Sequence, residues 1–133
     1  MRRRQPKTFQ IVKLAAKAVV DTIGYGHREA VYQRALTVEL MNHGVASMTE
    51  VPVPFFTRGV CVGTGRIDVL TDHHIIEIKT HTMSKILLAR SKQQTRKYLS
   101  AMRKVNGGNR HRKGMLILFD NSAEKLFIRC LPA

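Results

Sequence analysis

The amino-acid sequence predicts an α/β domain in which helices flank a small mixed β-sheet, with the element order ααβββαββ. Two observations support this fold class. Apolar residues recur at helical spacing in three segments, and five shorter runs are rich in β-branched and aromatic residues. With 133 residues, the chain has the length of one domain. We therefore expect a single domain at residues 7–133, preceded by a basic tail at residues 1–6.

Two helices are predicted in the N-terminal third of the chain. The first is expected over residues 8–22, where an apolar residue recurs every three or four positions. The turn Gly24-Tyr25-Gly26 interrupts this pattern. A second helix is expected from about His27 to Asn42, where His43-Gly44 ends it.

Three β-rich runs and a long helix follow. The runs are Val51–Thr57, Val60–Leu70 and His74–Thr80. Ser84 to about Lys104 has helical periodicity, and an Asn-Gly-rich segment ends it.

Two further β-rich runs close the chain. Gly114–Phe119 and Lys125–Cys130 predict a terminal hairpin around Asn121-Ser122. These runs complete the small mixed sheet.

The net charge indicates the partner. Lys and Arg number 23 against 9 for Asp and Glu, so the formal charge is +14. A field of this size attracts polyanions and holds them through counterion release, and nucleic acid is the expected partner. The apolar runs are far shorter than a membrane span, so we expect no membrane segment.

The two cysteines bear on the compartment. Cys61 and Cys130 stand far apart, lack histidines at metal-binding spacing and fall in predicted strands. We expect buried free thiols and an intracellular, reducing compartment, with cytoplasm, nucleus and virion left open.

The candidate chemistry lies on two adjacent strands. Because side chains alternate along a strand, Glu77 and Lys79 share one face. If Asp72-His73 forms a two-residue turn, Asp68 lies opposite Glu77, although that pair lacks the glycine favoured in such turns. Two carboxylates so close together require a cation, and a hard ion such as Mg²⁺ prefers oxygen ligands. The alternative is a surface hairpin in which Glu77 and Lys79 merely form an ion pair.

A third carboxylate is expected beside this pair. Glu29, Tyr32, Leu36 and Leu40 form one stripe on the second helix, so Glu29 begins its buried face. There it would need a metal or the Lys79 ammonium as its partner. The alternative is a first-turn glutamate that is favoured by the helix dipole.

The third helix carries much of the positive charge. No acidic residue occurs between Glu77 and Asp120, whereas solvated faces normally mix both signs. The segment therefore predicts a phosphate track, and Gln94 lies at the edge of the apolar face, where it could point into the site. The expected nucleic-acid contacts are Lys85, Arg90, Lys92, Arg96, Lys97, Arg103, Lys104, Arg110, Arg112 and Lys113. The low aromatic content of 6% gives little support for a base-stacking platform.

The motif Gly26-His27-Arg28-Glu29-Ala30-Val31-Tyr32 is followed along the chain by Arg66-Ile67-Asp68, Ile76-Glu77-Ile78-Lys79, Gln94 and Arg129. Together these residues resemble the pattern of the GxxExxY family within the PD-(D/E)XK nuclease-like superfamily. It implies a restriction-endonuclease-like core. It further implies a metal site made by Asp68, Glu77 and the backbone carbonyl of Ile78, with Lys79 catalytic. Glu29 and Gln94 match accessory positions of that site.

Two features depart from the family pattern. Leu118-Phe119 stands where the family usually has an Asn-Phe pair, and a basic Asn-Gly-rich loop follows the third predicted helix. Both suggest altered substrate contacts, and neither removes a metal ligand.

The leading hypothesis is an Mg²⁺- or Mn²⁺-dependent nuclease, and the resemblance implies 5′-phosphate and 3′-hydroxyl ends. The resemblance favours DNA over RNA. A homodimer would suit a duplex cutter, which needs two active sites, but no dimer face can be identified. The alternatives are a basic architectural DNA-binding protein with little activity and an accessory subunit that binds an acidic protein.

Overall fold

The computed structural model describes residues 7–105 and 112–131. It confirms the order ααβββαββ. The helices are α1 (Lys7–Ile23), α2 (Glu29–Asn42) and α3 (Lys85–Val105). The strands are β1 (Met48–Thr57), β2 (Val60–Leu70), β3 (His74–Lys79), β4 (Lys113–Asp120) and β5 (Lys125–Leu131). The basic tail at residues 1–6 and the Asn-Gly-rich loop at 106–111 lie outside the described residues.

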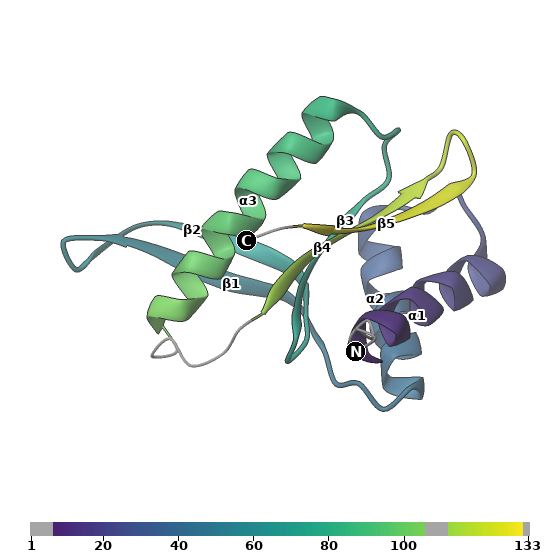
Figure 1. Ribbon diagram of the computed structural model, residues 1–133, viewed down its shortest axis with the longest axis horizontal. Coiled ribbons are helices and arrows are strands. Elements are labelled where there is room, and N and C mark those ends of the chain that lie inside the picture. The colour runs from purple at the N-terminus through teal and green to yellow at the C-terminus, as the bar shows by residue number, and fades with distance from the viewer. Residues whose placement is uncertain (1–6, 106–111, 132–133) are drawn as a thin grey trace, which may run out of the picture.

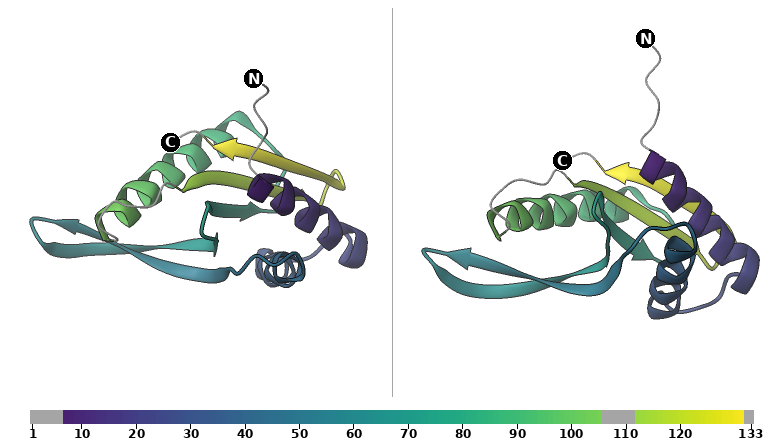
Figure 2. Two further views of the ribbon diagram at one scale, coloured as in Figure 1. Left: turned by 60° about the horizontal axis from the view of Figure 1, so that its bottom comes forward. Right: turned by 90° about the horizontal axis from the view of Figure 1, so that it is seen from below.

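One mixed sheet organises the described residues, with the five strands in the order β1-β2-β3-β4-β5. Only β3 and β4 are parallel, and α3 makes the connection between them. The other neighbours are antiparallel. The helices lie on different sides of this sheet, with α1 beside α2 and α3 apart from both (Figures 1 and 2).

Strand alternation divides the core into two parts. Ile76 and Ile78 pack with α1 and α2, whereas Ile75 packs with Tyr98 and Leu99 of α3. Glu77 and Lys79 have the parity of Ile75, so they belong to the α3 face of β3. This confirms the prediction that Glu77 and Lys79 lie on the face of the strand opposite to Ile76 and Ile78. Among the described helices, none is both long and apolar enough to cross a membrane.

Strands β1 and β2 form a long hairpin that extends beyond the layered part of the molecule (Figure 1). Arg58 and Gly59 connect them with φ angles of 50° and 79°. Positive φ at both central residues is the requirement of a type I′ turn, whose twist matches that of the strands. The register shifts between Phe55 and Phe56, opposite the Cys61–Gly63 segment. This irregularity adjoins the glycine-rich segment Gly63-Thr64-Gly65, and glycine in a strand often accompanies such a bulge.

The β2–β3 turn is the two-residue connection at Asp72-His73 that the sequence analysis assumed. The Thr71 amide donates to the His74 carbonyl at 3.0 Å. The amides of His73 and His74 donate in turn to Oγ1 of Thr71, at 3.2 and 2.9 Å. A threonine side chain therefore stabilises a turn that has no glycine.

His74 should make the protein sensitive to acid. It is 2% exposed, and burial, His73 and Lys113 together lower its pKa from 6.5 to about 4. Below pH 6.5 the unfolded chain takes up a proton that folded His74 refuses. The stability contributed by neutral His74 is complete above pH 6.5 and should be lost as pH falls toward 4, by roughly 3 kcal/mol in total.

Denaturant unfolding between pH 4.5 and 7.5 checks this prediction. His74→Gln should flatten the acid limb of the stability curve, whereas exposed His43→Gln should leave it unchanged. An acid limb of equal slope in both variants would show that another group controls it.

The expectation about the cysteines is half right. Cys61 and Cys130 are free, but both are exposed, so their predicted burial is wrong. Cys61 lies near the tip of the β1–β2 hairpin, and Cys130 lies on β5, the edge strand of the sheet. Strand membership alone therefore did not determine which side chains are buried.

Candidate active site

The candidate site lies where β2 separates from β3. Pairing between the two strands ends at Val69 and Ile76, one step before Asp68 would lie opposite Glu77. The half-buried Asp68 takes the place of the missing ladder bond, because its Oδ2 accepts a hydrogen bond of 2.8 Å from the Ile78 amide. The diverging strands thus leave a carboxylate beside the middle of the sheet.

Glu77 is a buried carboxylate that is only partly compensated. It is 9% exposed, and its Oε2 has no hydrogen-bond partner among the described residues. Its Oε1 lies 3.4 Å from Nζ of the half-buried Lys79. A buried carboxylate oxygen without a partner is costly unless a further donor or cation satisfies it.

The electrostatics of the three groups are coupled. Burial raises the pKa of Asp68, and the Ile78 amide and Lys79 offset this only in part. Burial and the nearby Asp68 likewise keep the pKa of Glu77 above its ordinary value, although Lys79 opposes them. Burial alone would lower the pKa of Lys79, but Glu77, Glu29 and Asp68 outweigh it and raise that pKa. Lys79 is therefore a stable cation close to Glu77, and burial disfavours the charged forms of both carboxylates.

Gln94 reaches the same pocket from α3. The lining includes Asp68, Glu77, Lys79, Gln94 and Tyr98. Nε2 of Gln94 donates to the Tyr98 hydroxyl at 2.7 Å, and the Arg66 amide reaches that hydroxyl at 3.3 Å. The tyrosine thus holds Gln94 against the strand that carries Asp68.

Gly65 makes this arrangement sterically possible. A Cβ at Gly65 would lie 2.6 Å from Cε1 and 2.9 Å from the hydroxyl oxygen of Tyr98. We expect Gly65→Ala to displace the ring and Gln94 with it, at a cost of about 1–3 kcal/mol in stability. The rate of the nucleic-acid cleavage expected from the sequence should fall by about ten- to a hundredfold, because small displacements of groups near the reacting atoms lower the rate.

Gly63→Ala is the matched control, since a Cβ there meets nothing within 4 Å. Thermal unfolding and turnover of both variants check the prediction. Equal behaviour of the two would show that the approach of Tyr98 to the strand does not position the site.

A loop and a tyrosine fix Glu29 at the start of α2. Gly26 has a φ of 99°, which favours glycine, and its amide donates to Oδ1 of Asn121 at 2.7 Å. The Tyr32 hydroxyl lies 3.1 Å from the same oxygen, and the Tyr32 ring stacks on Phe119 with centroids 4.1 Å apart. The glycine and tyrosine of the sequence motif therefore hold the loop that places Glu29.

Glu29 lies near the two strands without joining a compact cluster. It is half-buried in the first turn of α2, and its charge raises the pKa of both Asp68 and Lys79. Within the described residues no group of three or more His, Cys, Asp or Glu side chains could hold a metal ion. The position of Glu29 in the first turn thus agrees with the helix-dipole interpretation, and its charge also raises the pKa values of Asp68 and Lys79.

Two carboxylates and one carbonyl form a donor set that suits Mg²⁺. The N–H and C=O of a strand residue point toward the same neighbouring strand, so the Ile78 carbonyl faces the side of Asp68. Mg²⁺ takes oxygen ligands, commonly one or two carboxylates completed by water and phosphate. The unsatisfied oxygen of Glu77 and the raised pKa of both carboxylates fit such a cation.

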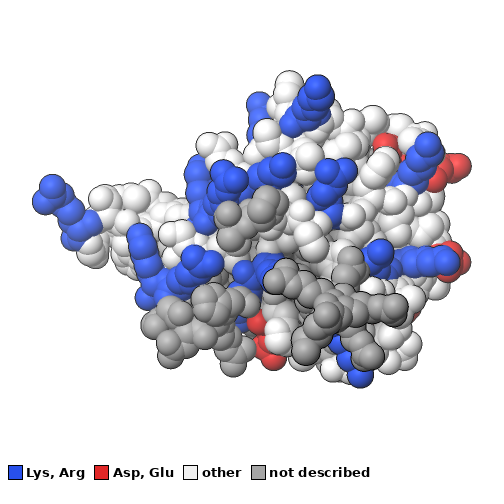
Figure 3. Space-filling model, viewed as in Figure 1, with Lys and Arg blue, Asp and Glu red and all other residues white. Residues whose placement is uncertain are grey.

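The predicted basic residues of α3 are exposed, apart from the half-buried Lys92. Lys and Arg side chains gather over α3 on the face shown in Figure 3. Arg90 and Lys97 line a hollow next to Gln94, so part of the track adjoins the site. Lys85, Lys92, Arg103 and Lys104 line neither this hollow nor the pocket of Asp68 and Glu77.

The last basic segment is placed differently. Nε of Arg112 donates to the Thr71 carbonyl at 2.9 Å, and Lys113 pairs with His74. Three strand positions, about 10 Å, separate His74 from Glu77, and neither Arg112 nor Lys113 lines the pocket, so the structure does not bring these two residues to the site. Arg110 lies outside the described residues.

Sequence reasoning missed three contributors. Ser91 is 1% exposed, and its hydroxyl lies near enough to Glu77 to lower the pKa of that carboxyl slightly, although it forms no hydrogen bond. Thr95 is equally buried, and a Cβ at Gly114 would overlap its methyl group, so helix and strand are in close contact there. Asn121 was assigned only to a turn. Small polar residues on a helix and an asparagine in a hairpin give no sequence signal of these roles.

Comparison with known proteins identifies the family. The family model described as the PD-(D/E)XK nuclease superfamily matches residues 6–130. No curated protein and no solved structure matches the chain significantly. The fold, an α/β domain with a five-stranded mixed sheet, is consistent with the restriction-endonuclease-like core of that superfamily. The chain belongs to the PD-(D/E)XK nuclease superfamily.

Proposed function

We propose that this protein is an Mg²⁺- or Mn²⁺-dependent nuclease that hydrolyses phosphodiester bonds of DNA. One observation carries the proposal: Asp68 and the partner-deficient Glu77 lie beside Lys79 in one pocket of a chain with a net charge of +14. Nucleic acid supplies the phosphate that such a charge attracts. We also propose that the chain is a GxxExxY protein, because Gly26 and Tyr32 jointly position Glu29.

Asp68, Glu77 and the Ile78 carbonyl are the proposed ligands of the ion. When bound, the ion would polarise a phosphate oxygen and make a water molecule more acidic. The hydrogen bond from the Ile78 amide fixes the rotamer of Asp68 before any ion arrives. Asp68 therefore needs little reorganisation on binding, and such preorganisation is what electrostatic catalysis requires.

Lys79 and Gln94 act on the reacting groups in this proposal. The raised pKa of Lys79 makes it a cation in the metal-free protein, so it is suited to bind a phosphate oxygen and offset developing charge. Gln94 can orient water or phosphate from the α3 side, since Tyr98 holds its amide. Glu29 contributes negative charge that keeps Lys79 protonated.

The second candidate is an architectural DNA-binding protein. The charge of +14 on 133 residues favours it, because tight binding requires no chemistry. The buried Oε2 of Glu77 favours the nuclease. An oxygen without a hydrogen-bond partner destabilises the fold, and a purely structural role gives no reason to retain it.

Incubation of wild-type protein with supercoiled plasmid separates the two candidates. In Mg²⁺ or Mn²⁺ we expect nicked and linear products with 5′-phosphate and 3′-hydroxyl ends, and in EDTA we expect binding without cleavage. Salt-sensitive binding with intact plasmid in both metals would overturn the nuclease and leave the architectural protein.

A further inference from the structure

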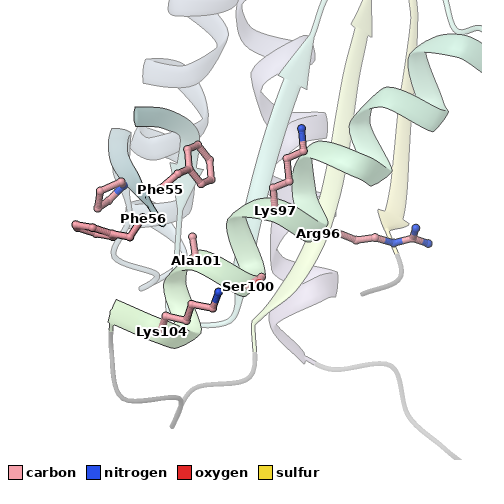
Figure 4. A pocket seen from close by; sticks show the side chains of 8 residues that line it. Phe55, Phe56, Arg96, Lys97, Ser100, Ala101 and Lys104 are labelled. Carbon is pink, nitrogen blue, oxygen red and sulfur yellow. The ribbon is translucent and has the colours of Figure 1, made fainter. Parts of the chain in front are cut away.

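A groove runs between the β1–β2 hairpin and the C-terminal half of α3, outside the candidate active site (Figure 4). Its volume of about 410 Å³ is within the range of small-ligand sites. The lining residues are Pro54, Phe55, Phe56, Arg96, Lys97, Ser100, Ala101 and Lys104. The groove therefore combines an aromatic wall from β1 with a basic wall from α3.

The aromatic wall presents an unusually exposed ring. Phe56 is 57% exposed, whereas the half-buried Phe55 stacks on Tyr98 with ring centroids 6.2 Å apart. Consecutive strand residues normally point to opposite faces, but the register shifts between these two. Such irregularities re-aim side chains, so both phenylalanines line one groove.

The basic wall has cations available for a ligand. Lys97 and Lys104 are exposed, and neither takes part in an ion pair within the described residues. Arg96 also lines the groove, but its guanidinium extends away from the phenylalanines (Figure 4). An anionic ligand that also carries a flat apolar face would match both walls.

The groove is connected to the catalytic pocket through shared residues. Gln94 and Tyr98 line both the pocket of Asp68 and Glu77 and an intermediate hollow. That hollow shares Phe55 and Lys97 with the groove. From Gln94 to Lys104 the helix rises about 15 Å, the span of about four nucleotides at duplex spacing.

We propose that this groove binds an unpaired nucleotide, so that the preferred substrate carries a single-stranded segment next to the cleaved bond. The inference rests on the proposed nuclease function and specifies its substrate class. A phenyl ring stacks on the face of a base, which is accessible when that base is unpaired. Lys97 and Lys104 would contact the flanking phosphates, and Phe56 would stack on the base.

Binding measured in EDTA tests the proposal without requiring cleavage. Fluorescence anisotropy would compare a labelled single-stranded oligonucleotide with a blunt duplex of the same length. We expect Phe56→Ala to weaken single-strand binding about five- to a hundredfold, the loss typical of one base–aromatic stack, and duplex binding less than twofold. Val62→Ala, which removes a 63% exposed side chain from the same hairpin outside the groove, should change neither.

An abasic-site walk locates the stacked base. In the same assay, one base at a time is removed from the oligonucleotide. At one position the removal should weaken binding to wild type as much as Phe56→Ala does, and it should not weaken binding to Phe56→Ala further. A uniform loss at all positions would show that no single base occupies the groove and would overturn the proposal.

The outcomes separate failure of this proposal from failure of the nuclease. If wild type nicks plasmid in Mg²⁺ but Phe56→Ala binds single strands normally, only the groove proposal is wrong. If wild type neither binds nor cuts nucleic acid, both are wrong. Binding of a poly-glutamate peptide that depends on Phe56, with unchanged single-strand binding, would assign the groove to an acidic protein partner instead.

Discussion

Glu77→Gln is expected to lower the rate of cleavage at least a thousandfold and, without metal, to raise the melting temperature at pH 7. The loss of rate follows because Gln removes the negative charge of a proposed metal ligand. The gain in stability follows because the raised pKa of Glu77 means that folding disfavours its charge. That rise already includes the favourable contribution of Lys79, so the net effect of removing the charge is stabilising.

The pH dependence gives this prediction its sign. Above its ordinary pKa of 4.5, Glu77 ionises readily in the unfolded chain and reluctantly in the folded one. The destabilisation of the folded protein by the charge of Glu77 grows as pH rises from the pKa of Glu77 in the unfolded chain to its pKa in the folded chain. It is complete above the folded value. The difference between Glu77→Gln and wild type should therefore disappear below about pH 4.5 and be largest at neutral pH.

Differential scanning calorimetry with and without Mg²⁺ checks the combined signature. In a domain of this length, ~1 kcal/mol moves the melting temperature by roughly 3–6 °C. Wild type should gain stability from Mg²⁺, whereas Glu77→Gln should gain much less. Glu39→Gln, which removes a carboxylate from α2 away from the pocket, controls for net charge. A lower melting temperature for Glu77→Gln than for wild type would contradict the interpretation of a strained carboxylate.

Lys79→Met is expected to lower the rate of cleavage a hundred- to ten-thousandfold while destabilising the metal-free protein. The ammonium is the one described cation within 4.0 Å of a site carboxylate, at 3.4 Å from Glu77. Since its pKa is raised, it stabilises the fold below pH 10.5 and loses that effect as pH rises through the folded value. Its removal leaves two carboxylates to repel each other and leaves the phosphate without a nearby cation.

The readout separates catalysis from folding. Mg²⁺ should restore the melting temperature of Lys79→Met, because the ion replaces the missing positive charge, but cleavage should stay low. Lys17→Met, on the exposed side of α1, should match wild type in both measurements. Near-normal cleavage by Lys79→Met would exclude this lysine from the chemistry.

The two variants are expected to be inactive for opposite physical reasons. Glu77→Gln loses a negative charge that the fold disfavours. Lys79→Met loses the positive charge that compensates this negative charge. Opposite changes in metal-free stability with a shared loss of activity are therefore the signature of one coupled site. Independent surface residues would not show it.

The sequence predicted the framework of the site because alternation along strands is a strong constraint. Ile76 and Ile78 had to face a core, so Glu77 and Lys79 had to face the other way. The two-residue turn at Asp72-His73 could only be assumed, because it lacks the favoured glycine, and Thr71 supplies the hydrogen bonds that stabilise it. Element order was predictable for the same reason, and boundaries differed by a few residues at most.

Long-range contacts account for what could not be predicted. The packing of Tyr98 against Gly65 joins residues 33 positions apart, and Asn121 binds a loop 95 positions away at Gly26. The exposure of Phe56 and Cys61 depends on the course of the long β1–β2 hairpin and on its register shift between Phe55 and Phe56. No periodicity in the chain encodes that course.

Nicking of supercoiled plasmid, measured against Mg²⁺ concentration for wild type, Glu77→Gln and Glu39→Gln, tests the central claim most directly. A metal-dependent nuclease centred on Asp68 and Glu77 predicts saturable nicking by wild type and Glu39→Gln, with only background from Glu77→Gln. Equal nicking by all three proteins would contradict it and place the activity at a different centre.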